Sequence, residues 1–108
     1  MTLGGVTLLE TRLEGFLEIA AVLCGLMILL ALFCAFIRLA LGPTLADRVV
    51  ALDFVSMLLV AFLTLFALAA RRDAFLDAAL ALALVAFLAT VAFARYLVTA
   101  RAREARRR

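Results

Sequence analysis

The stretch Arg38-Leu-Ala-Leu-Gly-Pro-Thr-Leu-Ala-Asp-Arg-Val-Val-Ala-Leu-Asp53 separates two long apolar segments and decides how the chain folds. It contains the only proline of the chain, directly after a glycine, and such a pair interrupts a helix. Thr44 follows the break, and Asp47 comes three residues later, a spacing typical of a helix N-cap. A second helix therefore begins here, and it carries the carboxylate of Asp53 into an apolar segment.

The composition is that of an integral membrane protein. Of the 108 residues, 69% are hydrophobic, and the mean hydropathy is +1.25, whereas soluble domains are about half apolar. The length suits three spans of about 20 residues each and no separate soluble domain. There is no histidine, no nucleophile–base pair, no metal-ligand cluster and no glycine-rich phosphate loop, so neither an enzyme nor a cofactor is expected. The net charge of +3 lies in the tail and indicates orientation, not nucleic-acid binding.

The apolar segments predict an all-α membrane protein with three transmembrane helices in one domain. We expect an interfacial lead-in over residues 1–15, spans over 16–37, 49–70 and 78–98, loops over 38–48 and 71–77, and a basic, disordered tail over 99–108. The short second loop predicts that the second and third helices are antiparallel neighbours, and Asp77 is expected to cap the third.

The third span has one face of small residues and one of large residues. Ala79, Ala83, Ala86 and Thr90 form the small face, and Leu80, Leu84, Phe87 and Val91 form the large one. Because helices in lipid associate by close packing, the small face is predicted to contact another helix.

The arginines predict the orientation. Arg38, Arg48, Arg95 and the five arginines of the tail lie on one side of a three-span chain, against Arg12, Arg71 and Arg72 on the other. Positive residues accumulate on the cytoplasmic side, so we expect the C-terminus in the cytoplasm and the N-terminus outside.

Asp53 is the candidate functional residue, because a lone carboxylate costs about 2.5–3.5 kcal/mol at the centre of a membrane and less near its edge. Together with Ser56, Thr64 and Arg71 it forms a polar stripe on the second span. We favour a stripe that faces a partner helix or a hydrated path. The alternative is that the Ser and Thr hydroxyl groups bond only to their own backbone.

Two functions fit these residues alone. One is an accessory subunit of a multisubunit ion transporter, in which Asp53 binds an ion or a proton. The other is a small, self-assembling, holin-like pore with a basic tail. The specific sequence between the first two spans favours the transporter subunit, because a pore needs no such detail.

The run Arg38…Gly42-Pro43-Thr44-x-x-Asp47-Arg48-Val49-Val50-Ala51-Leu52-Asp53 strongly resembles the F subunit of the Mrp (Pha, Mnh) multisubunit cation/proton antiporters. The run from Leu76-Asp77 through Leu82-Ala83-Leu84, Phe87 and Thr90-Val91-Ala92 to Ala94-Arg95-Tyr96-Leu97 resembles the last helix of the same family. The resemblance covers residues 38–97.

This resemblance implies a multi-pass subunit in the cytoplasmic membrane of a prokaryote. Its partners would be two large subunits related to complex I and other small subunits, E and G among them. The assembly would exchange Na+, K+ or Li+ for protons and support pH homeostasis. Related subunits occur in membrane-bound hydrogenase complexes, which is the alternative assembly. The neighbouring subunits decide between the two assemblies.

The resemblance also assigns site residues. The embedded acid of the family corresponds to Asp53, and its turn corresponds to Gly42, Pro43 and Thr44. We expect Asp53 to lie at a subunit interface near a cytoplasmic entrance and to bind Na+ or a proton transiently. Ser56, Thr64 and carbonyl groups near the Gly-Pro break are expected to help. Arg38, Asp47 and Arg48 complete the turn and its cap. The rival hypothesis is that Asp53 pairs with a basic residue of a partner to fix assembly.

Overall fold

The protein consists of three long helices joined by two tight turns. The computed structural model describes residues 2–108, in which helix α1 covers Thr2–Leu41, α2 covers Leu45–Ala70 and α3 covers Asp73–Arg107. All three are long and apolar enough to cross a membrane, as the sequence predicted. At 1.5 Å per residue, even α2 is about 39 Å long and exceeds the roughly 30 Å of a bilayer's hydrocarbon core.

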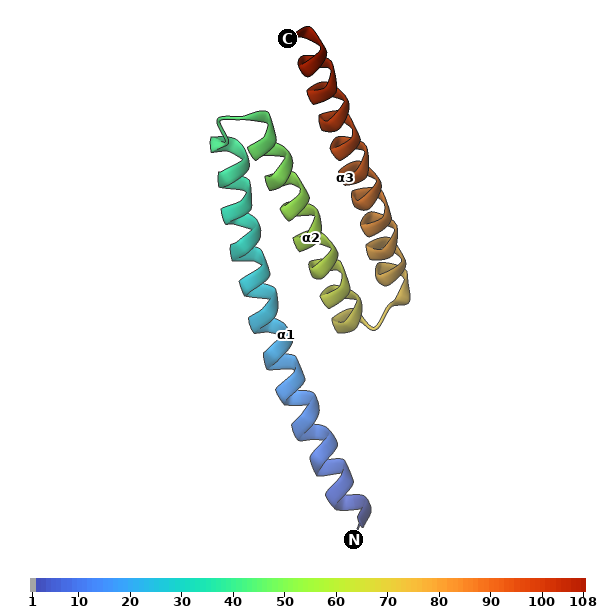
Figure 1. Cartoon of the computed structure of the whole chain (residues 1–108). Helices are drawn as coiled ribbons and strands as arrows, with labels where there is room; N and C mark the ends of the chain where they lie inside the picture. The colour runs from blue at the N-terminus through green and yellow to red at the C-terminus, as the bar shows by residue number, and fades with distance from the viewer. Residues whose placement is uncertain (1) are drawn as a thin grey trace.

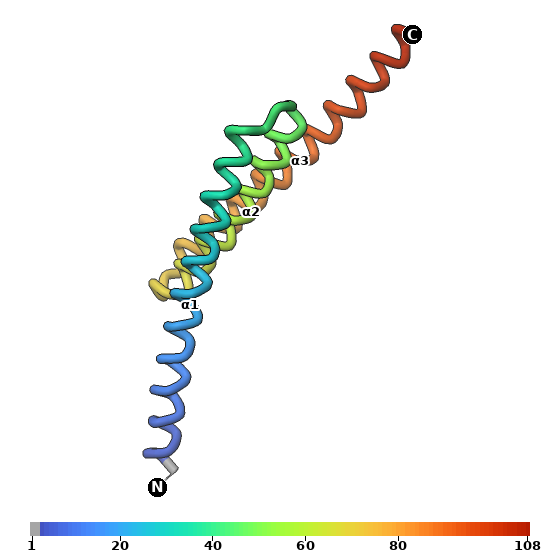
Figure 2. The backbone as a smooth tube through the Cα atoms, turned by 90° about the vertical axis from the view of Figure 1, so that its left-hand side faces the viewer, coloured from blue at the N-terminus to red at the C-terminus, as the bar shows by residue number. Residues whose placement is uncertain are grey.

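The helices lie side by side in a flat row with α2 in the middle (Figure 1). Within the described residues, α2 contacts both α1 and α3, whereas α1 and α3 do not contact each other. The extents of 81 × 26 × 19 Å reflect this shape, and the view along the row shows the three helices overlapping (Figure 2). The first part of α1 and the last part of α3 project beyond the row at opposite ends. The predicted antiparallel pairing of the second and third helices is confirmed.

Both turns are built by local chain chemistry. At the first, Thr44 is the N-cap of α2, and its side chain accepts a hydrogen bond from the Asp47 amide at 3.2 Å. At the second, Arg71 adopts the left-handed conformation with φ 52°, which ends α2 and lets the Arg72 amide donate to the Ala67 carbonyl. The predicted cap at Thr44 is therefore confirmed.

Small residues form the contacts between helices. The buried side chains are Ala35, Ala51, Val55, Ala67 and Ala79. Ala79 is only 2% exposed, while Leu80 and Leu84 on the other face of α3 stay exposed. The small face of the third span thus packs against α2, as predicted, because small side chains let helix backbones approach closely. An edge-to-face pair of Phe66 and Phe75, with ring centroids 4.9 Å apart, closes the second turn.

The lead-in runs into the first span as one continuous helix, because α1 covers Thr2–Leu41 without a break. Two sequence predictions need correction. The tail is helical to Arg107 rather than disordered, because Ala and Arg are strong helix formers. Asp77 does not cap the third helix. The left-handed turn at Arg71 lets α3 begin at Asp73, one turn earlier than expected.

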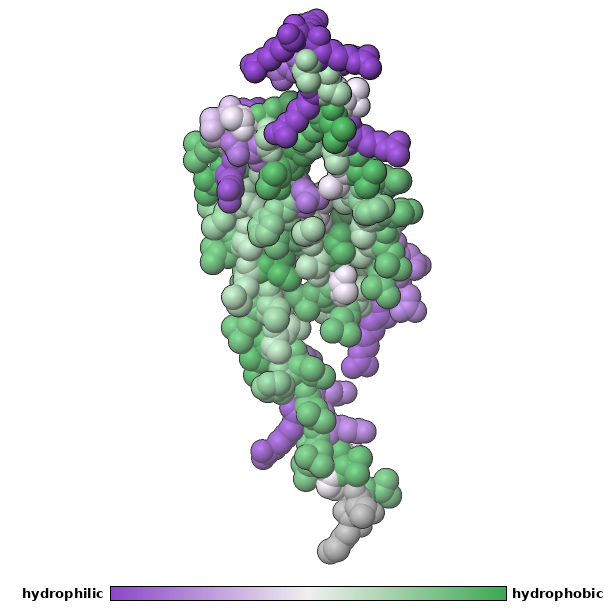
Figure 3. Space-filling model, in the orientation of Figure 1, coloured by the Kyte–Doolittle hydropathy of each residue, from purple (hydrophilic) through white to green (hydrophobic). Residues whose placement is uncertain are grey.

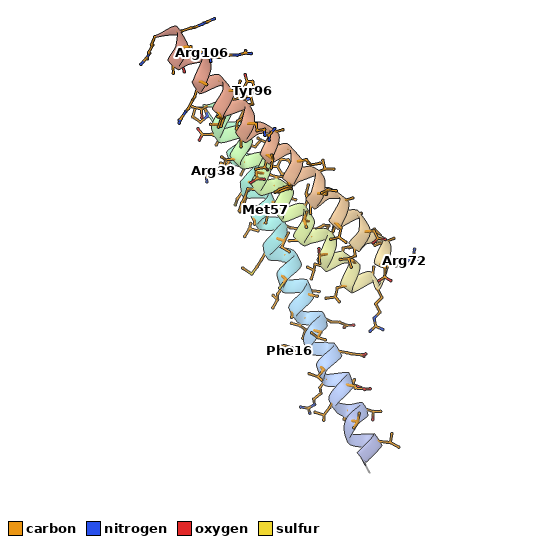
Figure 4. The ribbon with its side chains drawn as sticks, turned by 45° about the vertical axis from the view of Figure 1, so that its right-hand side comes forward. Phe16, Arg38, Met57, Arg72, Tyr96 and Arg106 are labelled. Carbon is orange, nitrogen blue, oxygen red and sulfur yellow. The ribbon has the colours of Figure 1, made fainter. Side chains whose placement is uncertain are left out.

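The surface is apolar around the middle of the row and charged towards its ends (Figure 3). Figure 4 shows Arg38 and Tyr96 at one end of the row, Arg72 at the opposite end and Met57 between them. Many large apolar side chains, among them Leu26, Phe33 and Phe87, are exposed in the single chain. Such a distribution suits a chain surrounded by lipid and by other membrane helices.

Candidate functional site

Asp53 is half-buried on the side of α2 that faces α3. Its Oδ1 lies 3.0 Å from the Oγ1 of Thr90, a residue 37 positions later in the chain. This is a side-chain hydrogen bond between two helices, and it holds the carboxyl group against α3. Asp53 therefore contacts a neighbouring helix of its own chain.

A groove of about 360 Å³ surrounds this pair between α2 and α3. Its walls are mostly apolar, and its polar side chains are those of Asp53, Ser56 and Thr90. The full lining is Asp53, Ser56, Met57, Val60, Ala83, Ala86, Phe87 and Thr90. Among the described residues no basic side chain lines it, so the negative charge of Asp53 has no partner charge within the groove.

The polar residues of the stripe predicted on α2 line two different grooves. The Ser56 hydroxyl lines the groove but donates to the Leu52 carbonyl at 2.9 Å, and the Thr64 hydroxyl donates to the Val60 carbonyl at 2.8 Å. Both hydroxyl groups thus bond to their own backbone, which was the alternative interpretation. Thr64 lines a different groove, near the second turn, together with Arg71.

The residues of the first turn are joined by side-chain hydrogen bonds. Thr44 Oγ1 also donates to Asp47 Oδ2 at 2.6 Å, and Arg48 Nε donates to the Gly42 carbonyl at 3.3 Å. Gly42 is buried, and a Cβ atom there would lie 3.3 Å from the Arg38 carbonyl oxygen and from Arg48 Cγ. Only glycine fits this close approach without a shift of its neighbours.

The turn and the carboxylate form two separate clusters. Arg38 lies in the last turn of α1 and lines a groove between α1 and α2 with Ala35 and Ala51. Pro43 is exposed between the two helices. At the break itself, the Gly42 carbonyl accepts from Arg48. The turn sets where α2 begins, and five further residues of helix carry Asp53 about 8 Å beyond Arg48.

Thr90 is the site residue that sequence reasoning missed as a functional group. It was placed on the small face of the third span only for packing. The usable signal is that Thr90 is the one hydroxyl residue on that face, opposite a helix with one embedded carboxylate. The pairing depends on how far α3 is displaced along α2, which the second turn decides.

The arrangement brings two oxygen-bearing side chains together in a mostly apolar groove. A carboxylate and a hydroxyl are hard oxygen ligands, and an uncompensated carboxylate in an apolar groove favours a proton, a metal cation or a basic side chain. Within residues 2–108 there is no group of three or more His, Cys, Asp or Glu side chains that would hold a metal permanently.

Comparison with known proteins identifies relatives of this chain. The chain is 42% identical over 65 residues to the F subunit of the Na+/H+ antiporter of Bacillus subtilis (strain 168), covering 60% of this chain and 69% of that protein. It is 36% identical over 72 residues to the F1 subunit of a Na+/H+ antiporter of Staphylococcus epidermidis, covering 67% of this chain and 74% of that protein.

A solved structure is similar as well. A chain of the membrane-bound sulfane sulfur reductase, an archaeal respiratory membrane complex, superposes with a TM-score of 0.62 at 44% identity. The match covers 68% of this chain and 92% of that one. The family model for multiple resistance and pH regulation protein F matches residues 46–98, which contain both Asp53 and Thr90. Because the Bacillus subtilis F subunit is 42% identical and the match covers 69% of it, the chain belongs to the MrpF/PhaF family.

Proposed function

We propose that this protein is the F subunit of a multisubunit antiporter that exchanges Na+ or another monovalent cation for protons. The observation that carries the proposal is the half-buried carboxylate of Asp53 in the α2–α3 groove of a chain that belongs to the MrpF/PhaF family. Its contribution is a step of the cation or proton route, together with assembly of the complex. Neither family membership nor the groove supports a self-assembling pore.

The protein lies in the cytoplasmic membrane with its C-terminus inside the cell. The support is the unequal distribution of arginine, because eight of the eleven arginines lie on the side of the first turn and the α3 extension. Asp53 is then in the cytoplasmic half of the bilayer. Its partners are the other antiporter subunits, which cover the exposed apolar flanks of the flat helix row.

Asp53 acts by exchanging one positive charge for another. A carboxylate in an apolar groove is stabilised by a bound cation, and a proton and Na+ compete for it. Two side-chain oxygens do not complete the shell of a hard cation, so water or partner subunits supply the remaining ligands. Thr64 stands about 16 Å along the helix from Asp53 and would serve a later part of the same route.

The first prediction concerns Asp53→Asn, measured as dye-monitored Na+/H+ exchange in everted vesicles that carry the whole complex. We expect exchange to be lost while the complex persists on a blot, since an amide carries no charge to exchange. Asp77→Asn is the matched control, because Asp77 is exposed and outside the groove. Normal exchange in Asp53→Asn would disprove the transport role, and loss of the complex would show that Asp53 serves assembly.

A second candidate assembly is a respiratory membrane complex, which the similarity to the archaeal chain favours. The same groove would serve ion translocation there, driven by a redox reaction of other subunits. Affinity purification of the tagged chain from its native membrane separates the two. Co-purifying redox-enzyme subunits would identify the respiratory complex, and their absence from an assembly that exchanges Na+ for protons would identify the antiporter.

A further inference from the structure

A second groove, between α1 and α2, is separate from the Asp53 site and ends at Arg38. Its volume is about 320 Å³. Apart from Arg38, its lining consists of small and apolar side chains, namely Ala31, Cys34, Ala35, Val50, Ala51 and Phe54. Arg38 is the lining residue of α1 nearest to the first turn, and among the described residues it is the one charge of this groove. The groove therefore has an apolar floor and a cationic end.

The guanidinium group of Arg38 pairs with no carboxylate of the described chain. Within residues 2–108 the one ion pair joins Arg71 to Glu14, at the opposite end of the row. The acid nearest to Arg38 in the sequence is Asp47, and its carboxylate accepts from Thr44. An arginine presents its N–H donors in a planar fork, which fits a phosphate group through two parallel hydrogen bonds. The exposed, unpaired Arg38 therefore suits an anionic phosphate ligand.

Arg38 lies at the level of lipid head groups. It directly follows the nineteen uncharged residues 19–37 and belongs to the last turn of α1. Tyr96 lies at the same end of the row (Figure 4), and tyrosine is enriched where a membrane meets water. The apolar part of the groove, which runs from Ala35 to Ala31 along α1, is then at the depth of acyl chains.

The end of the row that contains this groove is strongly basic. Eight of the eleven arginines lie there, against two acids outside the apolar segments, Asp47 and Glu104. Clusters of arginine beside a membrane span attract anionic lipids. The larger groove near the second turn differs, because Asp73 lines it together with Arg71 and Arg72, so that charges of both signs surround it. Charge complementarity to an anionic lipid is therefore greater at Arg38.

We propose that the α1–α2 groove binds one anionic phospholipid, with the phosphate on Arg38 and one acyl chain between the two helices. An α-helix with its side chains is about 10–12 Å across, so a helix of a partner subunit would only cover a groove of this size, whereas an acyl chain enters it. The lipid belongs to the leaflet at the arginine-rich end of the row. This inference goes beyond the proposed function, since it concerns the α1–α2 groove and not the Asp53 site.

The second prediction is tested by photocrosslinking in proteoliposomes that contain the whole complex. The probes are phosphatidylglycerol, which is anionic, and phosphatidylcholine, which has no net charge, each with a diazirine in one acyl chain. Mass spectrometry of the peptides locates the label. We expect label on residues 31–35 and 50–54, with about fivefold more from phosphatidylglycerol, because one arginine near the membrane surface favours an anionic lipid by about this factor.

Two pairs of variants test the two parts of the site. Arg38→Gln removes the charge and should make the label from both lipids equal, whereas Arg12→Gln removes an exposed arginine of the same helix outside the groove and should keep the preference. Cys34→Phe fills the groove and should lower the label on residues 50–54 severalfold for both lipids. Cys24→Phe makes the same change at an exposed position outside the groove and should not.

Three outcomes overturn the proposal. Absence of label from the groove of the intact complex would show that a partner subunit covers it. Equal label from both lipids in the wild type would remove head-group recognition, and a preference that persists in Arg38→Gln would place the phosphate elsewhere. If Arg38→Gln prevents assembly, the wild-type ratio and the Cys34 and Cys24 variants still decide. The readout is lipid label and not ion exchange, so failure here leaves the proposed function to its own test with Asp53→Asn.

Discussion

Single side chains at the first turn determine where the second helix starts. Thr44 and Asp47 satisfy each other, with the Asp47 amide donating to Thr44 and the Thr44 hydroxyl donating to the Asp47 carboxylate. Arg48 adds a bond to the Gly42 carbonyl, so the chain enters α2 in one defined direction. Because a helix is rigid along its axis, this direction also fixes which side of α2 presents Asp53 to α3.

The third prediction tests the cap at Thr44. Thr44→Ala removes the acceptor of the Asp47 amide and is expected to weaken the first turn of α2 by about 1 kcal/mol. Hydrogen exchange of the Asp47 and Arg48 amides, followed by mass spectrometry on the complex, would then be about fivefold faster. Thr44→Ser keeps the cap and should retain the wild-type rate. Equal exchange in the alanine variant and the wild type would contradict the role of the side chain.

Between elements, the decisive feature is the close approach of α3 to α2. The helices meet through alanine, with Ala79 2% exposed and Ala83 and Ala86 half-buried along the same face. In lipid there is no hydrophobic force to hold helices together, so this contact depends on shape. The distance between Asp53 and Thr90 depends on the same contact.

The fourth prediction tests this packing. Ala79→Leu places a large side chain into a filled contact and is expected to cost about 1–3 kcal/mol. The melting temperature of the purified complex and the amount of this chain in the membrane should both fall. Ala81→Leu makes the same change at an exposed position of α3 and should have little effect. An equal loss in both variants would show that the α2–α3 contact is not the cause.

At the scale of the whole molecule, the chain is a flat row with two broad apolar flanks. One end of the row carries Arg38 and Tyr96, and the other carries Arg72 (Figure 4). An ion pair between Arg71 and Glu14, with N–O distance 3.8 Å, ties α1 to the second turn. Both side chains are largely exposed, so this pair adds little stability.

The fifth prediction concerns orientation. Cys24 and Cys34 are free, so both are first replaced by serine, and single cysteines are introduced as Arg106→Cys and Asp73→Cys. With a membrane-impermeant maleimide, we expect Arg106→Cys to be labelled only in everted vesicles and Asp73→Cys only in intact cells. The reverse pattern would place the C-terminus outside and move Asp53 to the outer half of the membrane.

The sequence by itself determined the three helices, the break between the first two, the cap at Thr44 and the position of Asp53 within an apolar segment. These features depend on local chemistry: long apolar runs, a Gly-Pro pair, a Thr-Asp spacing and one unusual charge. The tertiary structure alone decided that Ser56 and Thr64 bond to their own backbone, that α3 begins at Asp73 and that Thr90 holds Asp53. The physical reason is that a contact between residues 37 positions apart depends on the left-handed turn at Arg71 and on the close packing of small side chains, which together set how far one helix is displaced along the other.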